Sequence, residues 1–470
     1  MIIGRIEEIE RLRQAQLSKV SEFYAVYGRR RVGKTFLIKE AFNYTFAFHH
    51  AGKSKGTKLE QIDAFVKSMC QQGFKIERTP RTWADAFYAL ENGLAQLPEG
   101  KKVVFLDELP WMDTPKSDFL SSLEHFWNSW ATMRRDILLV VCGSATSWIV
   151  RKILKNKGGL HNRLSGRILL KPFTLNECER FAVAKGLAMT RMQILEAYMI
   201  MGGIPFYWDQ LDRRKSLDQN IDALFFEESG ELCGEFEELY ASLFRNPEGH
   251  LAVVTALAKR KSGMTRGELL SATGITNNGA FSKVLEELVE CGFLRIYRMP
   301  GKKSYDAIYQ LIDNYTLFHF DFLTGSENTG DGWSALRGRP VRNTWCGCAF
   351  ERVCLQHLTQ LKSALGIAGV RTQAYAWRSS RERADGAQVD LLIDRSDDVI
   401  NLCEMKFSGA TYEIDKEESL KIANRRERFA AETGTRKAIF VTMVTTCGIA
   451  HNAYWNDIQS EVTLDDLFVS

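Results

Sequence analysis

The stretch Gly28-Arg-Arg-Arg-Val-Gly-Lys-Thr35 has the residue types and spacing of a phosphate-binding loop. Its two glycines permit a tight turn whose backbone N–H groups face phosphate oxygens. The start of the helix that follows adds partial positive charge. We expect Lys34 to reach the terminal phosphates of ATP and Thr35 to ligate Mg²⁺. The residues expected to line the ATP site here are Gly28, Arg29, Arg30, Arg31, Val32, Gly33, Lys34 and Thr35.

A second stretch, Val103-Val-Phe-Leu-Asp-Glu108, is an apolar strand that ends in two acids. Asp107 is predicted to hold Mg²⁺ through water, and Glu108 to polarise the attacking water. The apolar run Ile137–Cys142 leads into Gly143-Ser144. We expect Ser144 to contact the γ-phosphate or that water, and a serine that merely forms a turn is the alternative.

The third stretch runs from Val389 to Phe407 as an apolar strand, a polar turn and another apolar strand. Side chains alternate along a strand, so Glu404 and Lys406 share one face. Asp390 lies on the paired strand. Two carboxylates bind a divalent cation, and an adjacent lysine orients or activates water. The pattern predicts a metal site with Asp390 and Glu404 as ligands, and a solvated hairpin with ordinary charges is the alternative.

The elements that position these residues follow from the apolar pattern. Strands at Phe23–Tyr27, Val103–Leu106 and Ile137–Cys142 alternate with helices at Lys58–Cys70, Thr82–Leu97 and Ser117–Thr132. Such alternation indicates an α/β fold with a largely parallel sheet. Beyond about residue 235, three helices and a hairpin are typical of a winged helix. After a Gly- and Ser-containing connection, the remainder reads as another small α/β unit.

The first half resembles the AAA+/STAND-type P-loop ATPases of archaea and bacteria. The matching features are Gly4-Arg5 with Glu8, the phosphate loop, the strand ending in Asp107-Glu108, Leu164-Ser-Gly-Arg167 and Lys171-Pro-Phe. Gly202-Gly-Ile-Pro205 resembles the element with which such ATPases contact the base. The resemblance implies a three-layer core with a helical lid, Gly203 and Pro205 at the nucleotide, and a homo-oligomer. It also implies an arginine finger, for which Arg163 and Arg167 are the candidates.

The tail resembles the PD-(D/E)XK nuclease superfamily through Asp390 and the Glu404-Met-Lys406 triplet. That resemblance gives Asp390, Glu404 and Lys406 catalytic roles and adds Glu351 from a preceding helix. Arg378, Arg381 and Arg383 are candidates for gripping phosphates. In the winged helix, Asn277, Asn278, Ser282 and Lys283 are candidates for the major groove, and Lys302 and Lys303 for wing contacts; packing on the ATPase core is the competing interpretation.

Composition sets the wider limits. The chain has 470 residues, 45% of them hydrophobic and 26% charged, which is the balance of a globular protein. The net charge is only +4, so nucleic-acid binding requires local basic patches. No apolar run suits a signal peptide or a membrane span, and the ten cysteines form no CxxC pair. We therefore expect a cytoplasmic protein with reduced thiols and no membrane partner.

The predicted domains are an ATPase core (1–175), a helical lid (176–234), a winged helix (235–325), a linker (326–340) and a nuclease-like domain (341–470). The leading hypothesis is an ATPase that regulates a Mg²⁺-dependent nuclease acting on nucleic acid, with DNA expected before RNA. The alternatives are a signalling or scaffold ATPase, or a DNA-remodelling ATPase, whose tail binds a partner without cleaving.

Overall fold

The structure is a computed structural model. It describes residues 2–144, 146–155, 158–160, 162–244, 246–297, 307–324, 332–379 and 387–469. The wing lysines Lys302 and Lys303, the arginines Arg381 and Arg383, and part of the expected linker lie outside these ranges. The chain divides into two compact units: the first comprises 1–172, 241–245 and 286–291, and the second comprises 173–240, 246–285 and 292–470.

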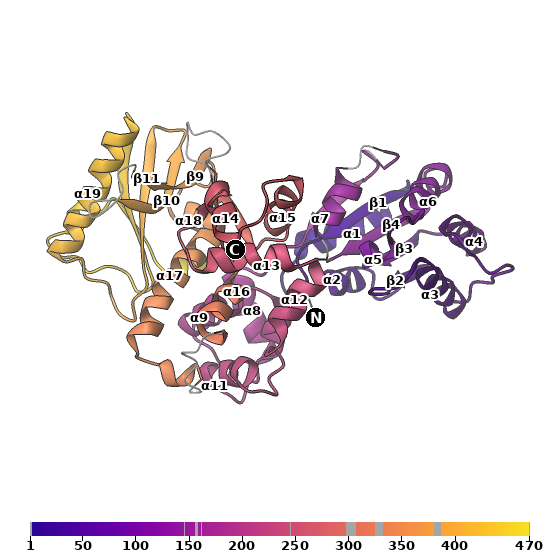
Figure 1. Cartoon of the computed structure of the whole chain (residues 1–470), viewed down its shortest axis with the longest axis horizontal. Helices are drawn as coiled ribbons and strands as arrows, with labels where there is room; N and C mark the ends of the chain where they lie inside the picture. The colour runs from indigo at the N-terminus through magenta and orange to yellow at the C-terminus, as the bar shows by residue number, and fades with distance from the viewer. Residues whose placement is uncertain are drawn as a thin grey trace. The chain divides into compact units, whose positions relative to one another are not determined.

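The first unit is built on a five-stranded parallel sheet in the order β2-β3-β4-β1-β5 (Figure 1). All residues of β3 and β4 are buried, which explains the apolar runs at 103–106 and 137–142. The strands are β1 (Glu22–Tyr27), β2 (Phe48–Ala51), β3 (Lys102–Asp107), β4 (Ile137–Gly143) and β5 (Gly166–Leu169). The helices are α1 (Ile6–Leu17), α2 (Lys34–Ala41), α3 (Lys58–Gln71), α4 (Trp83–Ala95), α5 (Leu109–Met112), α6 (Phe119–His125) and α7 (Thr146–Ile149).

The parallel α/β fold expected from the sequence is confirmed, with two short strands added at the sheet edges. Strand β2 has the sequence FHHA and β5 the sequence GRIL. Neither is a long apolar run, because an edge strand needs less apolar surface than a central one. The more important result is the strand order. Strand β4 lies between β1 and β3, so its end falls between the phosphate loop and the acidic pair.

The second unit begins with a helical part containing α8 (Leu175–Lys185), α9 (Arg191–Met201), α10 (Pro205–Asp209) and α11 (Leu217–Ile221). There follow α12 (Glu235–Leu243), α13 (Glu248–Ala258), α14 (Arg266–Thr273) and α15 (Gly279–Glu290), whose last residues, like those of α12, belong to the first unit. Strands β6 (Met264–Thr265), β7 (Leu294–Tyr297) and β8 (Ile308–Leu311) form an antiparallel sheet in the order β6-β8-β7. The expected hairpin corresponds to β7 and β8, but four described helices precede it where three were expected, and strand β6 was not expected. The assignment of this region as a winged helix stays a prediction.

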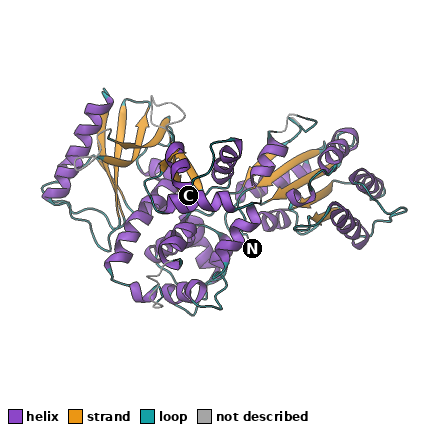
Figure 2. Ribbon diagram, viewed as in Figure 1, coloured by secondary structure: helices purple, strands orange, loops and turns teal. Residues whose placement is uncertain are grey.

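The C-terminal part of the second unit contains a mixed sheet in the order β13-β12-β11-β10-β9 (Figure 2). Strands β9 to β11 are antiparallel, whereas β11, β12 and β13 are parallel. The helices are α16 (Asn314–Phe318), α17 (Pro340–Gln356), α18 (Leu358–Ala364) and α19 (Lys416–Thr433). The strands are β9 (Thr372–Arg378), β10 (Gln388–Arg395), β11 (Val399–Lys406), β12 (Ala438–Thr445) and β13 (Ser460–Val462).

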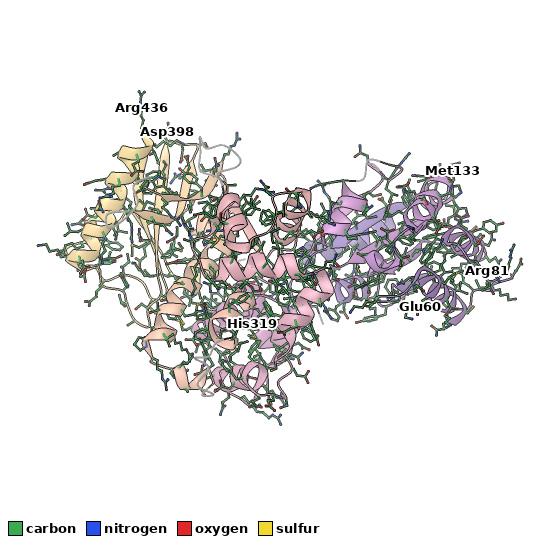
Figure 3. All side chains as sticks on the ribbon, in the orientation of Figure 1. Glu60, Arg81, Met133, His319, Asp398 and Arg436 are labelled. Atoms are coloured by element: carbon green, nitrogen blue, oxygen red, sulfur yellow. The ribbon has the colours of Figure 1, made fainter. Side chains whose placement is uncertain are left out.

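Helices α17 and α19 both pack on this sheet, α17 against β11 and α19 against β12. Phe429 of α19 belongs to an apolar cluster with Val389, Leu392 and Leu402. Asp398 in the β10–β11 turn and Arg436 before β12 mark the opposite end of the sheet from Glu404 (Figure 3). None of the helices described is long and apolar enough to cross a membrane.

Candidate active sites

The phosphate loop follows β1 directly and is fixed to strand β5. Gly28 has φ 147°, and a Cβ there would lie 2.3 Å from the carbonyl oxygen of Leu170. The N–H of Leu170 donates to the carbonyl of Tyr27 at 2.7 Å, which holds the two segments together. Helix α2 begins at Lys34, with Gly33 as its cap. Only glycine fits at position 28, as the motif required.

Lys34 is buried inside this loop. Its Nζ donates to the carbonyl oxygens of Gly28 at 3.0 Å and of Arg29 at 2.9 Å. Burial lowers the pKa of Lys34, while the charges of Glu108 and Asp107 favour its protonated form. The ammonium therefore lies within the turn and close to the acidic pair.

Asp107 meets the loop at Thr35. The Thr35 hydroxyl donates to Asp107 Oδ2 at 2.8 Å, and the N–H of Glu108 donates to Oδ1 at 2.8 Å. Cys142 Sγ also lies 2.6 Å from Oδ1. A carboxylate and a hydroxyl oxygen side by side are hard ligands of the kind that Mg²⁺ prefers, so these residues fit that ion.

Glu108 is held by the end of strand β4. Its Oε2 accepts hydrogen bonds from the Ser144 N–H at 3.2 Å and from the Ser144 hydroxyl at 3.0 Å. Glu108 itself has φ 46°, which is unusual for a residue with a side chain. Ser144 thus contacts the predicted catalytic acid directly, and its contact with phosphate or water stays a prediction.

The two candidate fingers lie near the sheet edge. Arg163 and Arg167 are both exposed, and Arg167 belongs to edge strand β5, where it pairs with Ala25 of β1. Gly203 and Pro205 belong to the second unit. A Cβ on Gly203 would lie 1.9 Å from the Phe173 carbonyl oxygen, so glycine is required there by backbone packing. The roles of all four residues stay predictions.

Glu351 projects from α17 into a charged environment in the C-terminal part. Burial first, and then the negative charge of Asp390, raise the pKa of Glu351 to about 7. Glu404 raises this pKa as well, whereas Arg352 and Lys406 lower it. Asp390, Glu404 and Lys406 are therefore near enough to Glu351 to act on it electrostatically.

Asp390 and Glu404 lie where the ladder between β10 and β11 ends. The last cross-strand pair of that ladder is Leu391 with Cys403. On its other side, β10 has a register shift against β9 between Val389 and Leu392, which is the signature of a β-bulge. A bulge redirects side chains, and Asp390 lies inside it. Its carboxylate accepts a hydrogen bond from Gln388 at 2.6 Å.

Glu404 and Lys406 both form ion pairs with helix α19. Glu404 Oε2 accepts from Arg425 Nη1 at 2.7 Å, and Lys406 Nζ lies 2.6 Å from Glu418 Oε1. Burial raises the pKa of Glu404, although Arg425 and Lys406 oppose it. Burial lowers the pKa of Lys406, but the hydrogen bond and charge of Glu418 outweigh it and give a net rise. Both side chains therefore have defined partners.

Among the described residues, no three acidic, histidine or cysteine side chains form a group that could hold a metal ion. Asp390 and Glu404 as metal ligands accordingly stay a prediction. Of the other candidates for binding nucleic acid, Arg378 ends β9. Asn277 accepts a hydrogen bond from Arg266 at 2.9 Å, and Lys283 is exposed.

Three residues that contact the predicted sites were not among the candidates from the sequence: Cys142, Glu418 and Arg425. Cys142 is two residues before Ser144, so strand alternation places it on the same side. Glu418 and Arg425 are seven residues apart, about two turns along one face of α19. Both spacings can be read from the sequence. They predict a contact only when it is known that β4 lies beside β3 and that α19 faces β11.

Comparisons with known proteins support an ATPase function for the first part of the chain. Residues 3–211 match the model of an ATPase domain found predominantly in Archaea. An uncharacterized protein of Methanocaldococcus jannaschii, MJECL04, is 24% identical over 374 residues, which cover 77% of this chain and 78% of that protein. The match and the geometry of the phosphate loop agree on an archaeal-type P-loop ATPase domain.

Two solved structures align with part of this chain. The Walker-type ATPase PABY2304 of Pyrococcus abyssi aligns with a TM-score of 0.47 and 18% identity, covering 67% of this chain and 95% of that one. The ORC2 protein of Aeropyrum pernix aligns with a TM-score of 0.43 and 16% identity, covering 68% of this chain and 93% of that one.

Proposed function

We propose that this chain binds ATP with Mg²⁺ and hydrolyses it, and that ATP controls a Mg²⁺-dependent nuclease in its C-terminal part. The expected substrate is nucleic acid, with DNA before RNA. The observation that carries the nuclease assignment is that Asp390 and Glu404 occupy the positions directly beyond the last β10–β11 pair, Leu391 with Cys403. Burial, and then the charges that include those of Asp390 and Glu404, raise the pKa of Glu351. A perturbed carboxyl group surrounded by other acids and a lysine is a feature of functional sites.

The ATPase roles follow from the contacts at the end of β3. Lys34 would meet the terminal phosphates, and Thr35 and Asp107 would hold Mg²⁺, which would supply positive charge to stabilise the transferring phosphate. Glu108 orients the water that attacks the γ-phosphate. In this structure the Glu108 carboxylate is bonded to Ser144, so we propose that Ser144 exchanges this bond for one to phosphate or water during turnover.

The nuclease roles use the charged groups at the end of the β10–β11 ladder. Asp390 and Glu404 would hold Mg²⁺ once their side chains leave the arrangement described, which is not a metal-binding group, and Glu351 from α17 would complete the site. The ion would polarise the scissile phosphate. Lys406 would orient the attacking water. The new bond joins the water oxygen to phosphorus, and the bond to the leaving sugar oxygen breaks. For Glu404 to bind an ion, Arg425 has to give up its present contact.

The ion pairs with α19 also favour a second candidate function. If Glu404–Arg425 and Lys406–Glu418 persist, the tail is a charged surface that binds a partner without cleaving. The chain would then be a scaffold, signalling or DNA-remodelling ATPase. For either function we propose a homo-oligomer, because the exposed Arg163 and Arg167 are available to act on a neighbouring subunit.

The deciding experiment incubates the full chain with plasmid DNA and Mg²⁺, with and without ATP. Asp390→Ala and Glu404→Ala should lose Mg²⁺ binding and cleavage together, because each removes a ligand. Lys406→Ala should keep the ion and lose about a hundred-fold in rate, a typical loss for a group that assists proton transfer. Asp397→Ala is the matched control, since Asp397 pairs with Arg395 near the β10–β11 turn. No cleavage by the wild type, with or without ATP, would favour the scaffold function. Cleavage that is unchanged in all four variants would mean that Asp390, Glu404 and Lys406 are not its active site.

A further inference from the structure

Two side chains at the end of strand β4, Cys142 within it and Ser144 directly after it, contact the acids at the end of β3. Cys142 meets Asp107, and Ser144 meets Glu108. Both contacts form because β4 is the neighbour of β3 in the sheet, so that the ends of the two strands lie side by side. Ser144 belongs to the predicted catalytic set. Cys142 has no assigned role, although its partner is the predicted metal ligand.

The thiol of Cys142 is set up as a hydrogen-bond donor. The residue is wholly buried, with an exposed fraction of 0%. Its sulfur lies 2.6 Å from Asp107 Oδ1, and an ordinary cysteine thiol has a pKa of about 8.5. The group is therefore an S–H at neutral pH, which donates to a carboxylate and does not compete with it for a metal ion.

Each donor to Asp107 has a different character. The N–H of Glu108 belongs to the backbone of the next residue, so it moves together with Asp107 and does not fix the carboxylate relative to the rest of the sheet. The hydroxyl of Thr35 is itself a predicted metal ligand and is shared with the ion. Cys142 is the side-chain donor that comes from another strand, so it anchors the carboxylate to the sheet independently of the ion.

We propose that Cys142 is a positioning residue that fixes the Asp107 carboxylate for binding of Mg²⁺ with the nucleotide. The inference rests on the proposed ATP site and deepens it. Groups that hydrogen-bond a metal ligand orient that ligand, and their loss usually costs about 10–100-fold in metal affinity. Phosphate contacts by Lys34 and the loop do not pass through Cys142, so nucleotide binding without metal should be independent of it.

The test measures ATP affinity by calorimetry for the full chain, in EDTA and in saturating Mg²⁺. Cys142→Ala and Cys142→Val both remove the donor, and valine keeps the side-chain volume. Each should reduce the gain in affinity conferred by Mg²⁺ by about ten-fold, the lower end of the usual range for such partners. Cys142→Ser supplies a hydroxyl donor and should recover most of that gain. Affinity in EDTA should be the same for all four proteins.

Val141→Ala is the control, because Val141 is equally buried on the same strand and packs in the apolar core. Its Mg²⁺ gain should match the wild type. The inference is overturned if the gain is unchanged in Cys142→Val, if Val141→Ala reduces it equally, or if serine does not restore it. A wild-type protein that gains nothing from Mg²⁺ would instead contradict the proposed ATP site, which separates the two failures.

Discussion

The two acidic sites of this chain use similar residues but are organised differently. At the end of β3, Asp107 and Glu108 accept hydrogen bonds from Thr35, Cys142 and Ser144. These donors are neutral, so they orient the carboxylates without cancelling their charge. At the end of the β10–β11 ladder, Glu404 is paired with a cation. There the charge that would attract a metal ion is already balanced.

The difference shows that the ability of an acidic site to bind a metal ion depends on the groups that its carboxylates already contact. A carboxylate held by neutral donors keeps its charge available for Mg²⁺ or water. A buried carboxylate paired with arginine must exchange that partner before it can bind an ion, and separating a buried pair is costly. We therefore expect the ATP site to bind its ligand without rearrangement and the tail site to require a change at α19. This requirement offers a point at which ATP would control cleavage.

Glu108→Gln gives the largest expected effect. Glutamine keeps the size of the side chain but cannot polarise water as a carboxylate does, so hydrolysis should fall about a thousand-fold while ATP still binds. Single-turnover hydrolysis alongside equilibrium binding measures both quantities. Glu124→Gln, in α6 of the same unit, is the control and should leave hydrolysis unchanged. Normal turnover in Glu108→Gln would mean that a residue other than Glu108 activates the attacking water.

Lys34→Ala should weaken ATP binding by about a hundred-fold, because two charge-assisted contacts to phosphate are worth roughly 3 kcal/mol. Binding of a fluorescent ATP analogue measures the loss. Lys39→Ala, in the last turn of α2, controls for a general loss of positive charge. If the Lys34 variant binds as tightly as the wild type, the phosphate-loop assignment is wrong.

The arginine fingers test whether the ATP site is complete within one chain. If Arg163 or Arg167 acts on a neighbouring subunit, its alanine variant should bind ATP normally and hydrolyse it at least ~10-fold more slowly. Mixing that variant with Glu108→Gln protein should restore part of the turnover, because some interfaces then combine a wild-type finger with a wild-type Glu108. Full activity in a strictly monomeric protein would exclude a finger in trans.

The smallest expected effect is the pH dependence of cleavage that Glu351 gives to the predicted nuclease site. Its pKa of about 7 means that the carboxylate needed for Mg²⁺ forms only as the pH rises through neutrality. At sub-saturating Mg²⁺, where the ion does not yet lower this pKa, cleavage should therefore increase several-fold between pH 6 and pH 8, and Glu351→Gln should flatten this increase at a lower rate. A pH profile of plasmid cleavage for both proteins makes the comparison. An unchanged inflection in the variant would assign the titration to another group.

The Glu351 carboxyl group should make the protein less stable as the pH rises, whereas cleavage should increase. Without metal, the folded chain keeps the Glu351 proton that the unfolded chain releases near the usual carboxyl pKa of 4.5. Glu351 therefore lowers the free energy of unfolding as the pH rises from about 4.5 to about 7. Saturating Mg²⁺ should reverse this contribution, because the ion favours the carboxylate.

The first site was largely predictable from sequence because it depends on local motifs. A glycine loop between a strand and a helix, and an apolar strand ending in Asp107-Glu108, each fix geometry within a few residues. Strand order was not predictable, and it is the position of β4 that brings Cys142 to Asp107. Edge strands β2 and β5 were missed because short sequences such as FHHA carry little apolar pattern.

The hairpin in the C-terminal part was predictable from the sequence. The residues that form ion pairs with its charged side chains were not. Alternation along β11 correctly placed Glu404 and Lys406 together, since both contact α19. The bulge at Asp390 depends on pairing with β9, and the residue types at positions 389–392 do not predict a bulge. The ion pairs depend on the rotation of α19 over the sheet, which long-range packing determines.

Plasmid cleavage by the wild type, Lys34→Ala and Glu404→Ala, each with and without ATP, tests most directly whether the first site controls the second. The account predicts that ATP changes the cleavage rate of the wild type, that Lys34→Ala cleaves at one rate with or without ATP, and that Glu404→Ala does not cleave while still hydrolysing ATP. Cleavage by Glu404→Ala at the wild-type rate, or the same ATP response in Lys34→Ala as in the wild type, would contradict it.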